Sequence, residues 1–327
     1  MGSAEQRPRT GRVRSGSADW LKAAAIIAVV ITHSMPTAFQ PTFTAVDRSI
    51  NNLVSFHVPV FLLVAGWLSA SRQPLSWSSL ARRIGRVIPP YVIASTVMTA
   101  LGYARWDAFA WNLVLGSALG PYYYIPVWVV CVLSGWVWSR LSPRATVVVL
   151  AVVLVATAIR YFVWPMFWWT WAIRDPIGQG WLACFLIGWS ARIFSAEIWM
   201  QARPEWAVLA VLMCLPWLIV PHTWSGEHGI TLRHTSRVAY AVGVAWLGVA
   251  WLRPEAPRPV QWLSSATLPI FLYHEPISIF LRTELAAWPP MSRVVVVATV
   301  ATLVTCAGVA VAQRLIPVRL RSYLLGA

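Results

Sequence analysis

Long apolar runs separated by short polar stretches dominate the sequence. Ten of them approach the length of about 20 residues that an α-helix needs to cross a bilayer. They cover residues 20–38, 53–71, 87–104, 122–140, 145–163, 178–194, 206–222, 235–252, 264–282 and 293–314. The pattern predicts an all-α fold, a polytopic membrane helix bundle of about ten transmembrane helices.

The remaining segments are expected to be short. Residues 106–120, "WDAFAWNLVLGSALG", form a shorter apolar run that ends in glycine, and we interpret it as a re-entrant or interfacial helix. The first apolar run is expected to be a retained helix and not a cleaved signal peptide, because many further runs follow it. The predicted division is a basic, disordered cytoplasmic tail over 1–18, a transmembrane domain over 19–316 and a cytoplasmic tail over 317–327.

Composition supports the membrane interpretation. The chain has 327 residues, of which 58% are hydrophobic and 11% charged, whereas soluble domains carry about a quarter charged residues. The net charge of +15 is typical of nucleic-acid binding, but the arginines lie between the apolar runs and not in one patch, so no nucleic-acid partner is predicted. The four cysteines lie inside apolar runs without CxxC spacing and are interpreted as packing residues.

The arginines instead predict the topology. With the N-terminus inside, about 18 of the 26 basic residues fall on the inner side and about 8 on the outer side. This bias predicts that both termini are cytoplasmic and that the protein is a multi-pass protein of the plasma (inner) membrane.

Two histidines stand out in the first two apolar runs. His33 lies roughly 16 Å along the helix axis from Lys22 and shares a helical face with Lys22 and Asp19. His57 is predicted at a similar depth on the next, antiparallel span. A buried histidine can be a packing residue, but polar groups within a membrane are costly and usually functional. Histidine exchanges a proton near neutral pH, as a general base must.

Three arginines mark the inner mouth of the third run. Arg82, Arg83 and Arg86 lie in "SLARRIGRVIPPY", with Arg82 and Arg86 on one helical face. They anchor the helix at the inner surface or bind a phosphorylated cytoplasmic ligand, since guanidinium groups suit phosphate.

Four blocks in order carry a family resemblance: "DWLKAAAIIAVVITHS", "SFHVPVFLLVAGWL", "RRIGRVIPPY" and "LPIFLYHEPI". Together the blocks resemble the membrane-bound acyltransferase-3 family. Asp and Lys at the start of the first span and the Phe-His-x-Pro of the second are similar to its fucose 4-O-acetylase-like branch. The block "LLVAGW" departs from the aromatic and serine residues often found there, which leaves the shape of the pocket open.

The resemblance implies an O-acyltransferase that moves an acyl group, acetyl being expected, from cytoplasmic acyl-CoA to a hydroxyl of a sugar or glycoconjugate. It implies His33 as the essential residue, acting as general base or as a transient acyl carrier, with His57 orienting it or the acceptor. Lys22, Arg82, Arg83 and Arg86 are expected at the acyl-CoA. Lys22 and Asp19 can also pair with each other or with these arginines.

Further candidates lie later in the chain. His274 and Glu275 are adjacent on one predicted helix, so their side chains point about 100° apart and are rarely expected in one site. We assign both to substrate binding, with a structural role as the alternative. Trp168, in the cluster "YFVWPMFWWTWAIRD", belongs to an aromatic belt or to a sugar-stacking platform.

A zinc site is disfavoured in the loop with His222, His228 and His234, because it lacks a helical HxxxH pattern; no metal is predicted. The alternative function is a transporter or flippase of a sugar-linked or lipid substrate, since polar groups inside a bundle serve both. The absence of repeated halves in the sequence favours the enzyme.

Overall fold

The structure, a computed structural model, describes residues 15–36, 44–70, 74–163, 180–219, 226–252 and 255–326. Every regular element in these ranges is a helix, which confirms the all-α prediction. The elements in order are α1 (Gly16–His33), α2 (Ala45–Leu53), α3 (His57–Ser69), α4 (Trp77–Ala100), η1 (Trp106–Ala108), α5 (Phe109–Leu115), η2 (Gly120–Tyr123), α6 (Tyr124–Trp138), α7 (Pro143–Val163), α8 (Trp181–Ile193), α9 (Ala196–Ala202), α10 (Pro204–Ile219), α11 (Gly226–Trp251), α12 (Arg258–Ser265), α13 (Thr267–Glu284), α14 (Pro290–Leu315) and α15 (Val318–Leu324).

Each of the ten predicted apolar runs overlaps one of the longer helices, namely α1, α3, α4, α6, α7, α8, α10, α11, α13 and α14. Within the described ranges, two stretches are long and apolar enough to cross a membrane: Ala45–Ser69, which joins α2 and α3, and Pro290–Leu315. The bent pair Trp106–Leu115 and Gly120–Trp138 counts as a third if it forms one span. The number ten and the cytoplasmic placement of the termini therefore stay predictions.

Residues 106–120 do not form a straight helix of their own. They divide into η1, α5 and the start of η2, and α5 ends at Gly116 in the left-handed conformation (φ 66°). A side chain is strained at that backbone angle, so glycine permits the turn. The chain bends by 48° between this segment and α6. A bend of this kind is found in a broken span or in a re-entrant segment, so the expected re-entrant or interfacial helix stays a prediction.

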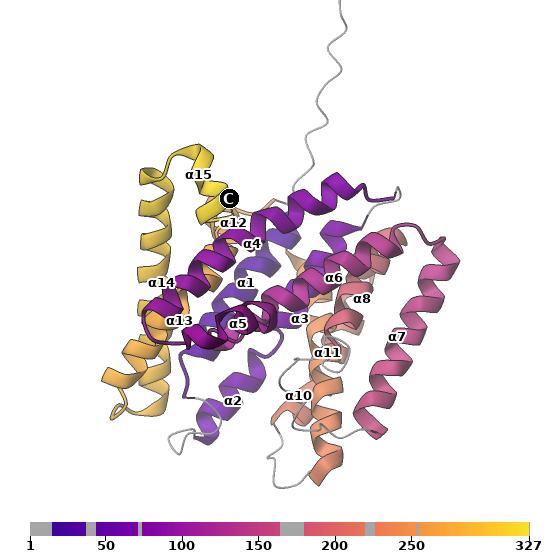
Figure 1. The fold of residues 1–327 in the computed structure, drawn as a ribbon. Coiled ribbons are helices and arrows are strands. Elements are labelled where there is room, and N and C mark those ends of the chain that lie inside the picture. The colour runs from indigo at the N-terminus through magenta and orange to yellow at the C-terminus, as the bar shows by residue number, and fades with distance from the viewer. Residues whose placement is uncertain are drawn as a thin grey trace, which may run out of the picture.

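The core forms where α3 meets α8. A Cβ atom on Gly66 would collide with the backbone of Phe185, and one on Gly188 would collide with the backbone of Leu63. Two glycines thus let the helix backbones approach closely, as is common between membrane helices. Figure 1 shows α1 near the middle of the bundle, with α13 and α14 on one side and α3 and α11 on the other.

The start of α1 lies at the same end of the bundle as the C-terminal segment. The buried carboxylate of Asp19 accepts a hydrogen bond of 2.6 Å from Ser264 Oγ in α12. The helix α15 packs on α4, near α12 (Figure 1), and Leu325 is buried. The residues predicted as a C-terminal tail therefore form a packed helix. Three cysteines are buried and Cys306 is partly exposed, all with free thiols, as expected for packing residues.

Candidate active site

The last residue of α1 meets the middle of α13. His33 Nδ1 lies 2.8 Å from Glu275 Oε2, and the two side chains are 21% and 8% exposed. A carboxylate only accepts hydrogen bonds, so the proton at this contact belongs to Nδ1, which leaves Nε2 as the basic nitrogen of a neutral ring. The helix end and the carboxylate together hold His33 as a histidine base is held in hydrolytic enzymes.

Arg282 connects the same carboxylate to the chain after α1. Its Nη2 donates to Glu275 Oε1 at 3.3 Å and its Nη1 donates to the carbonyl oxygen of Met35 at 2.6 Å. Arg282 was not among the site residues predicted from the sequence. Its spacing from Glu275 could have identified it, because residues seven apart on a helix share a face.

His274 also lies beside His33, with ring centroids 5.3 Å apart. Its Nδ1 lies 3.0 Å from each of the carbonyl oxygens of Ile270 and Phe271, and its fully buried Nε2 lies 3.8 Å from Glu275 Oε2. The structure thus brings both adjacent residues of α13 to His33, whereas their divergence on an ideal helix made this unexpected. Tertiary packing puts His33 between the two side-chain directions.

A proline follows this pair and changes the local hydrogen bonding. Pro276 has no amide hydrogen, so the carbonyl oxygen of Leu272 receives no donor from the next helical turn. The hydroxyl of Tyr122 donates to that oxygen at 2.7 Å. Tyr122 is fully buried, so the interrupted helix is tied to η2 within one turn of His274 and Glu275.

Tyr122 begins a run of three tyrosines that reach three different places. Tyr122 binds α13, Tyr123 lines a pocket with His57, and Tyr124 lines a larger cavity with Lys22. The junction of η2 and α6 therefore contacts α13, the His57 pocket and the larger cavity. Sequence reasoning did not single out this run, because aromatic residues are frequent throughout the chain.

The larger cavity has a volume of about 410 Å³ and a basic mouth. Lys22, Arg83 and Arg86 line it, as do the hydroxyl residues Ser69, Ser264, Ser265 and Thr267 and the apolar residues Phe61, Val64, Trp128, Leu268 and Phe271. Gly326, after α15, also lines it. The cavity thus combines cations and hydroxyls with an apolar interior.

A series of aromatic rings leads from this cavity to His33. The ring of Phe271 lies 5.4 Å from that of Tyr124 and 6.3 Å from that of His274. His274 in turn lies against His33. Of the predicted donor-binding residues, Lys22, Arg83 and Arg86 line the cavity; Arg82 is exposed and its Nε donates to the carbonyl oxygen of Ser78 at 3.4 Å.

His57 lies in a separate pocket of about 140 Å³. Its Nδ1 lies 2.7 Å from the carbonyl oxygen of Val54, which orients the ring. His33 and His274 influence His57 electrostatically, but the ring packed against His33 is that of His274. The pocket is lined by Asn51, Ser55, Val58, Pro59, Tyr123, Trp181, Arg237 and Val238.

One trio in the described ranges has the donor atoms of a metal site: those of His33, His274 and Glu275 lie within 4.8 Å of one another. Histidine and carboxylate are zinc ligands. The Arg282 guanidinium, 3.3 Å from Glu275, opposes a further cation at the same carboxylate. His222, Trp168 and the side chains of His228 and His234 lie outside the described residues.

Comparison with known families identifies the chain. Residues 16–311 match the acyltransferase-3 family, which is described as an acyltransferase domain. The chain belongs to the acyltransferase-3 family. Searches of curated proteins and of solved structures gave no match.

Family membership makes this protein a membrane acyltransferase. It favours the enzyme over the predicted alternative of a transporter or flippase. It also explains why the His33 cluster lies near the basic cavity, because an acyltransferase needs a base beside the binding site of its acyl donor.

Proposed function

We propose that this acyltransferase transfers an acyl group, with acetyl expected, from cytoplasmic acyl-CoA to a hydroxyl of a sugar or glycoconjugate at the plasma membrane. The observation that carries the proposal is the basic cavity whose aromatic wall leads to the His33–Glu275 pair. The assignment to the fucose 4-O-acetylase-like branch rests on Asp19, Lys22 and His57 in the sequence blocks quoted above.

The cavity suits acyl-CoA in both its charge and its lining. Lys22, Arg83 and Arg86 supply cations for the CoA phosphates, and guanidinium groups bind phosphate in a forked geometry. The amide N–H groups of the pantetheine arm can donate hydrogen bonds to the hydroxyl oxygens of Ser264, Ser265 and Thr267. The thioester then lies toward Phe271 and Tyr124, near His33.

In the proposed step, Nε2 of His33 removes the proton from the acceptor hydroxyl as its oxygen attacks the thioester carbonyl. The carbonyl becomes a tetrahedral oxyanion, the C–S bond breaks, and the CoA thiolate takes the proton back from His33. Glu275 stabilises the imidazolium that forms, and Arg282 holds Glu275 in place. A general base needs no acyl-histidine intermediate, and the carboxylate on Nδ1 favours this role.

The pocket around His57 suits the acceptor. The rings of Tyr123 and Trp181 have centroids 6.3 Å apart and offer faces on which a sugar ring stacks. Asn51, Ser55 and Arg237 add hydrogen-bonding groups to the same pocket. We propose that His57 orients the acceptor and that the hydroxyl reaches His33 from this side, opposite the donor.

The test is acyl transfer from radiolabelled acetyl-CoA in membranes that contain wild type, His33→Ala or His33→Gln, with extracted envelope glycans and lipids as acceptors. Glutamine keeps a polar side chain without a basic nitrogen. We expect label in a glycan fraction with wild type, and loss of at least about 1,000-fold in both variants at equal protein level.

Transfer retained by His33→Gln would overturn the role of His33 as base. Absence of transfer by wild type, across acyl donors of different chain length and across all acceptor fractions, would overturn the proposed reaction.

A further inference from the structure

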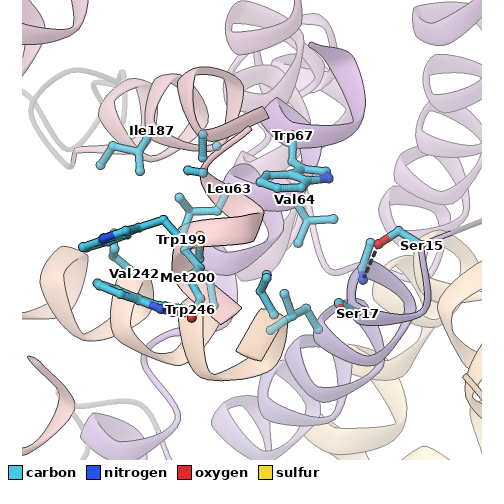
Figure 2. Close-up of a pocket in the computed structure, with 17 residues that line it drawn as sticks. Ser15, Ser17, Leu63, Val64, Trp67, Ile187, Trp199, Met200, Val242 and Trp246 are labelled. Carbon is cyan, nitrogen blue, oxygen red and sulfur yellow. Dashed lines mark hydrogen bonds between the residues drawn. The ribbon is translucent and has the colours of Figure 1, made fainter. Parts of the chain in front are cut away.

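A second apolar cavity lies on the other side of α3 from the basic cavity. It has a volume of about 210 Å³ and lies between α1, α3, α8, α9 and α11 (Figure 2). Val64 is the one residue that lines both cavities. The candidate reaction makes no use of this second cavity.

Its walls are almost entirely apolar and include three tryptophans. Trp199 and Trp246 lie side by side with ring centroids 4.6 Å apart, and Trp246 Nε1 donates to the carbonyl oxygen of Met200 at 2.7 Å (Figure 2). Trp67 lies across the cavity from them, and Ser15 and Ser17 lie at its edge (Figure 2). Water gains few hydrogen bonds in such a space, so an apolar chain is the suitable occupant.

The cavity lies at the depth of the inner leaflet on the predicted topology. It is formed by the start of α1 and the ends of α3 and α8, which the arginine distribution places on the cytoplasmic side. Tryptophan is enriched at this depth because its ring is apolar and its N–H is polar.

A positively charged side chain lies near this edge. The guanidinium of the exposed Arg192 lies 5.5 Å from the centroid of the Trp67 ring. The sequence directly before Ser15 contains Arg7, Arg9, Arg12 and Arg14, against one acidic residue, Glu5. Anionic headgroups of the inner leaflet complement this charge.

We infer that this cavity binds one acyl chain of an anionic phospholipid, with the headgroup phosphate at Arg192 and the hydroxyl of Ser17. The assignment is independent of the proposed acyl transfer, because apart from Val64 the cavity and the basic donor cavity have no lining residue in common. It also gives a reason for an exposed arginine stacked over a tryptophan at the end of α8.

The test uses phosphatidylglycerol with a photoactivatable diazirine on one acyl chain, in vesicles that contain the full chain. Cross-linked peptides are mapped by mass spectrometry. We expect labelling in α9 and in residues 242–249 of α11, with competition by unlabelled phosphatidylglycerol and at least five-fold weaker competition by phosphatidylcholine. Ala245→Trp fills the cavity and is expected to reduce this labelling at least five-fold.

Ala307→Trp, on the exposed surface of α14, is the matched control and is expected to change nothing. Arg192→Gln is expected to remove the preference for phosphatidylglycerol, whereas Arg314→Gln, also exposed and predicted to be cytoplasmic, is not. Labelling that is equal on α14 and α11, or that Ala245→Trp leaves unchanged, would show bulk lipid only and overturn the site. Equal competition by phosphatidylcholine would overturn the anionic headgroup.

Discussion

Two buried carboxylates in this protein each pair with an arginine, yet their surroundings differ. Asp47 in α2 lies 3.4 Å from Arg293 in α14, and Glu275 lies 3.3 Å from Arg282 within α13. Each cluster joins an early part of the chain to a late one, because Arg282 also binds the carbonyl of Met35 after α1.

The Asp47 cluster has a structural role. Asp47 Oδ2 accepts hydrogen bonds from the amide of Thr44 at 2.9 Å and from its hydroxyl at 2.7 Å, which caps α2. Its side chain is 0% exposed and that of Arg293 is 4% exposed. All its described partners are a helix cap and a permanently charged arginine, so the cluster has no group that exchanges a proton near neutral pH.

The Glu275 cluster contains a proton-exchanging group, His33, and that group is partly exposed. His33 is 21% exposed and lies at the end of the aromatic series that leads from the basic cavity. It carries an imidazole, the side chain that generally serves to exchange protons in enzymes. The comparison teaches that a buried ion pair alone is weak support for a functional site. A proton-exchanging partner and an adjoining cavity distinguish the two.

The largest effect is expected from Glu275→Gln. The variant removes the carboxylate that fixes the Nδ1 proton of His33, and acyl transfer from acetyl-CoA should fall by about 10,000-fold, as for a histidine base whose partner carboxylate becomes an amide. Because the variant also leaves Arg282, 16% exposed, without its counterion, transfer is measured per molecule of folded protein. Glu284→Gln, on the exposed face of the same helix, is the control and should keep full transfer. Full transfer by Glu275→Gln would show that the Glu275 cluster, like the Asp47 cluster, has a structural role only.

Asp47→Asn is expected to act on stability and not on chemistry. It leaves the Arg293 charge buried without its counterion, which costs about 3 kcal/mol of unfolding free energy. Thermal unfolding in detergent should show a lower melting temperature, while the folded fraction keeps its transfer rate per molecule. Asp107→Asn removes an exposed pair with Arg105, both more than 60% exposed, and should leave the melting temperature unchanged.

Replacing the arginines of the basic cavity tests whether it binds the acyl donor. Arg83→Gln and Arg86→Gln should each raise the KM for acetyl-CoA by about 10-fold with little change in kcat, because a phosphate contact contributes about 1.4 kcal/mol to binding. Arg82→Gln is the matched control on the same helix, since Arg82 does not line the cavity. An equal rise in all three variants would indicate surface electrostatics and not a donor site.

The smallest effect is expected at Gly326. A Cβ there would lie 2.5 Å from Leu268 Cδ2 and 2.9 Å from the carbonyl oxygen of Arg86, and the residue has a φ of 69°. Gly326→Ala should displace the segment after α15 from the cavity and raise the KM for acetyl-CoA by about 3-fold. Gly308→Ala, whose Cβ would meet nothing within 4 Å, should leave the KM unchanged.

Much of the fold could be read from local pattern. Each apolar run predicts a helix, because in a membrane the backbone must satisfy its own hydrogen bonds and helices do so within one segment. The cost of polar groups at membrane depth also identified His33, His57, His274 and Glu275 as candidates. The arginine block before the third run left anchoring and phosphate binding open, and the structure places Arg83 and Arg86 on the wall of a cavity.

The partners within the site were decided by tertiary packing alone. His33 was expected to work with His57, its neighbour along the chain, but the ring against it comes from α13, more than 240 residues later. The carboxylate and Arg282 arrive from the same distant helix, and Tyr122 replaces the hydrogen bond that Pro276 removes. Periodicity determines which face of a helix a side chain occupies, whereas the identity of the facing helix depends on packing between segments that are remote in the sequence.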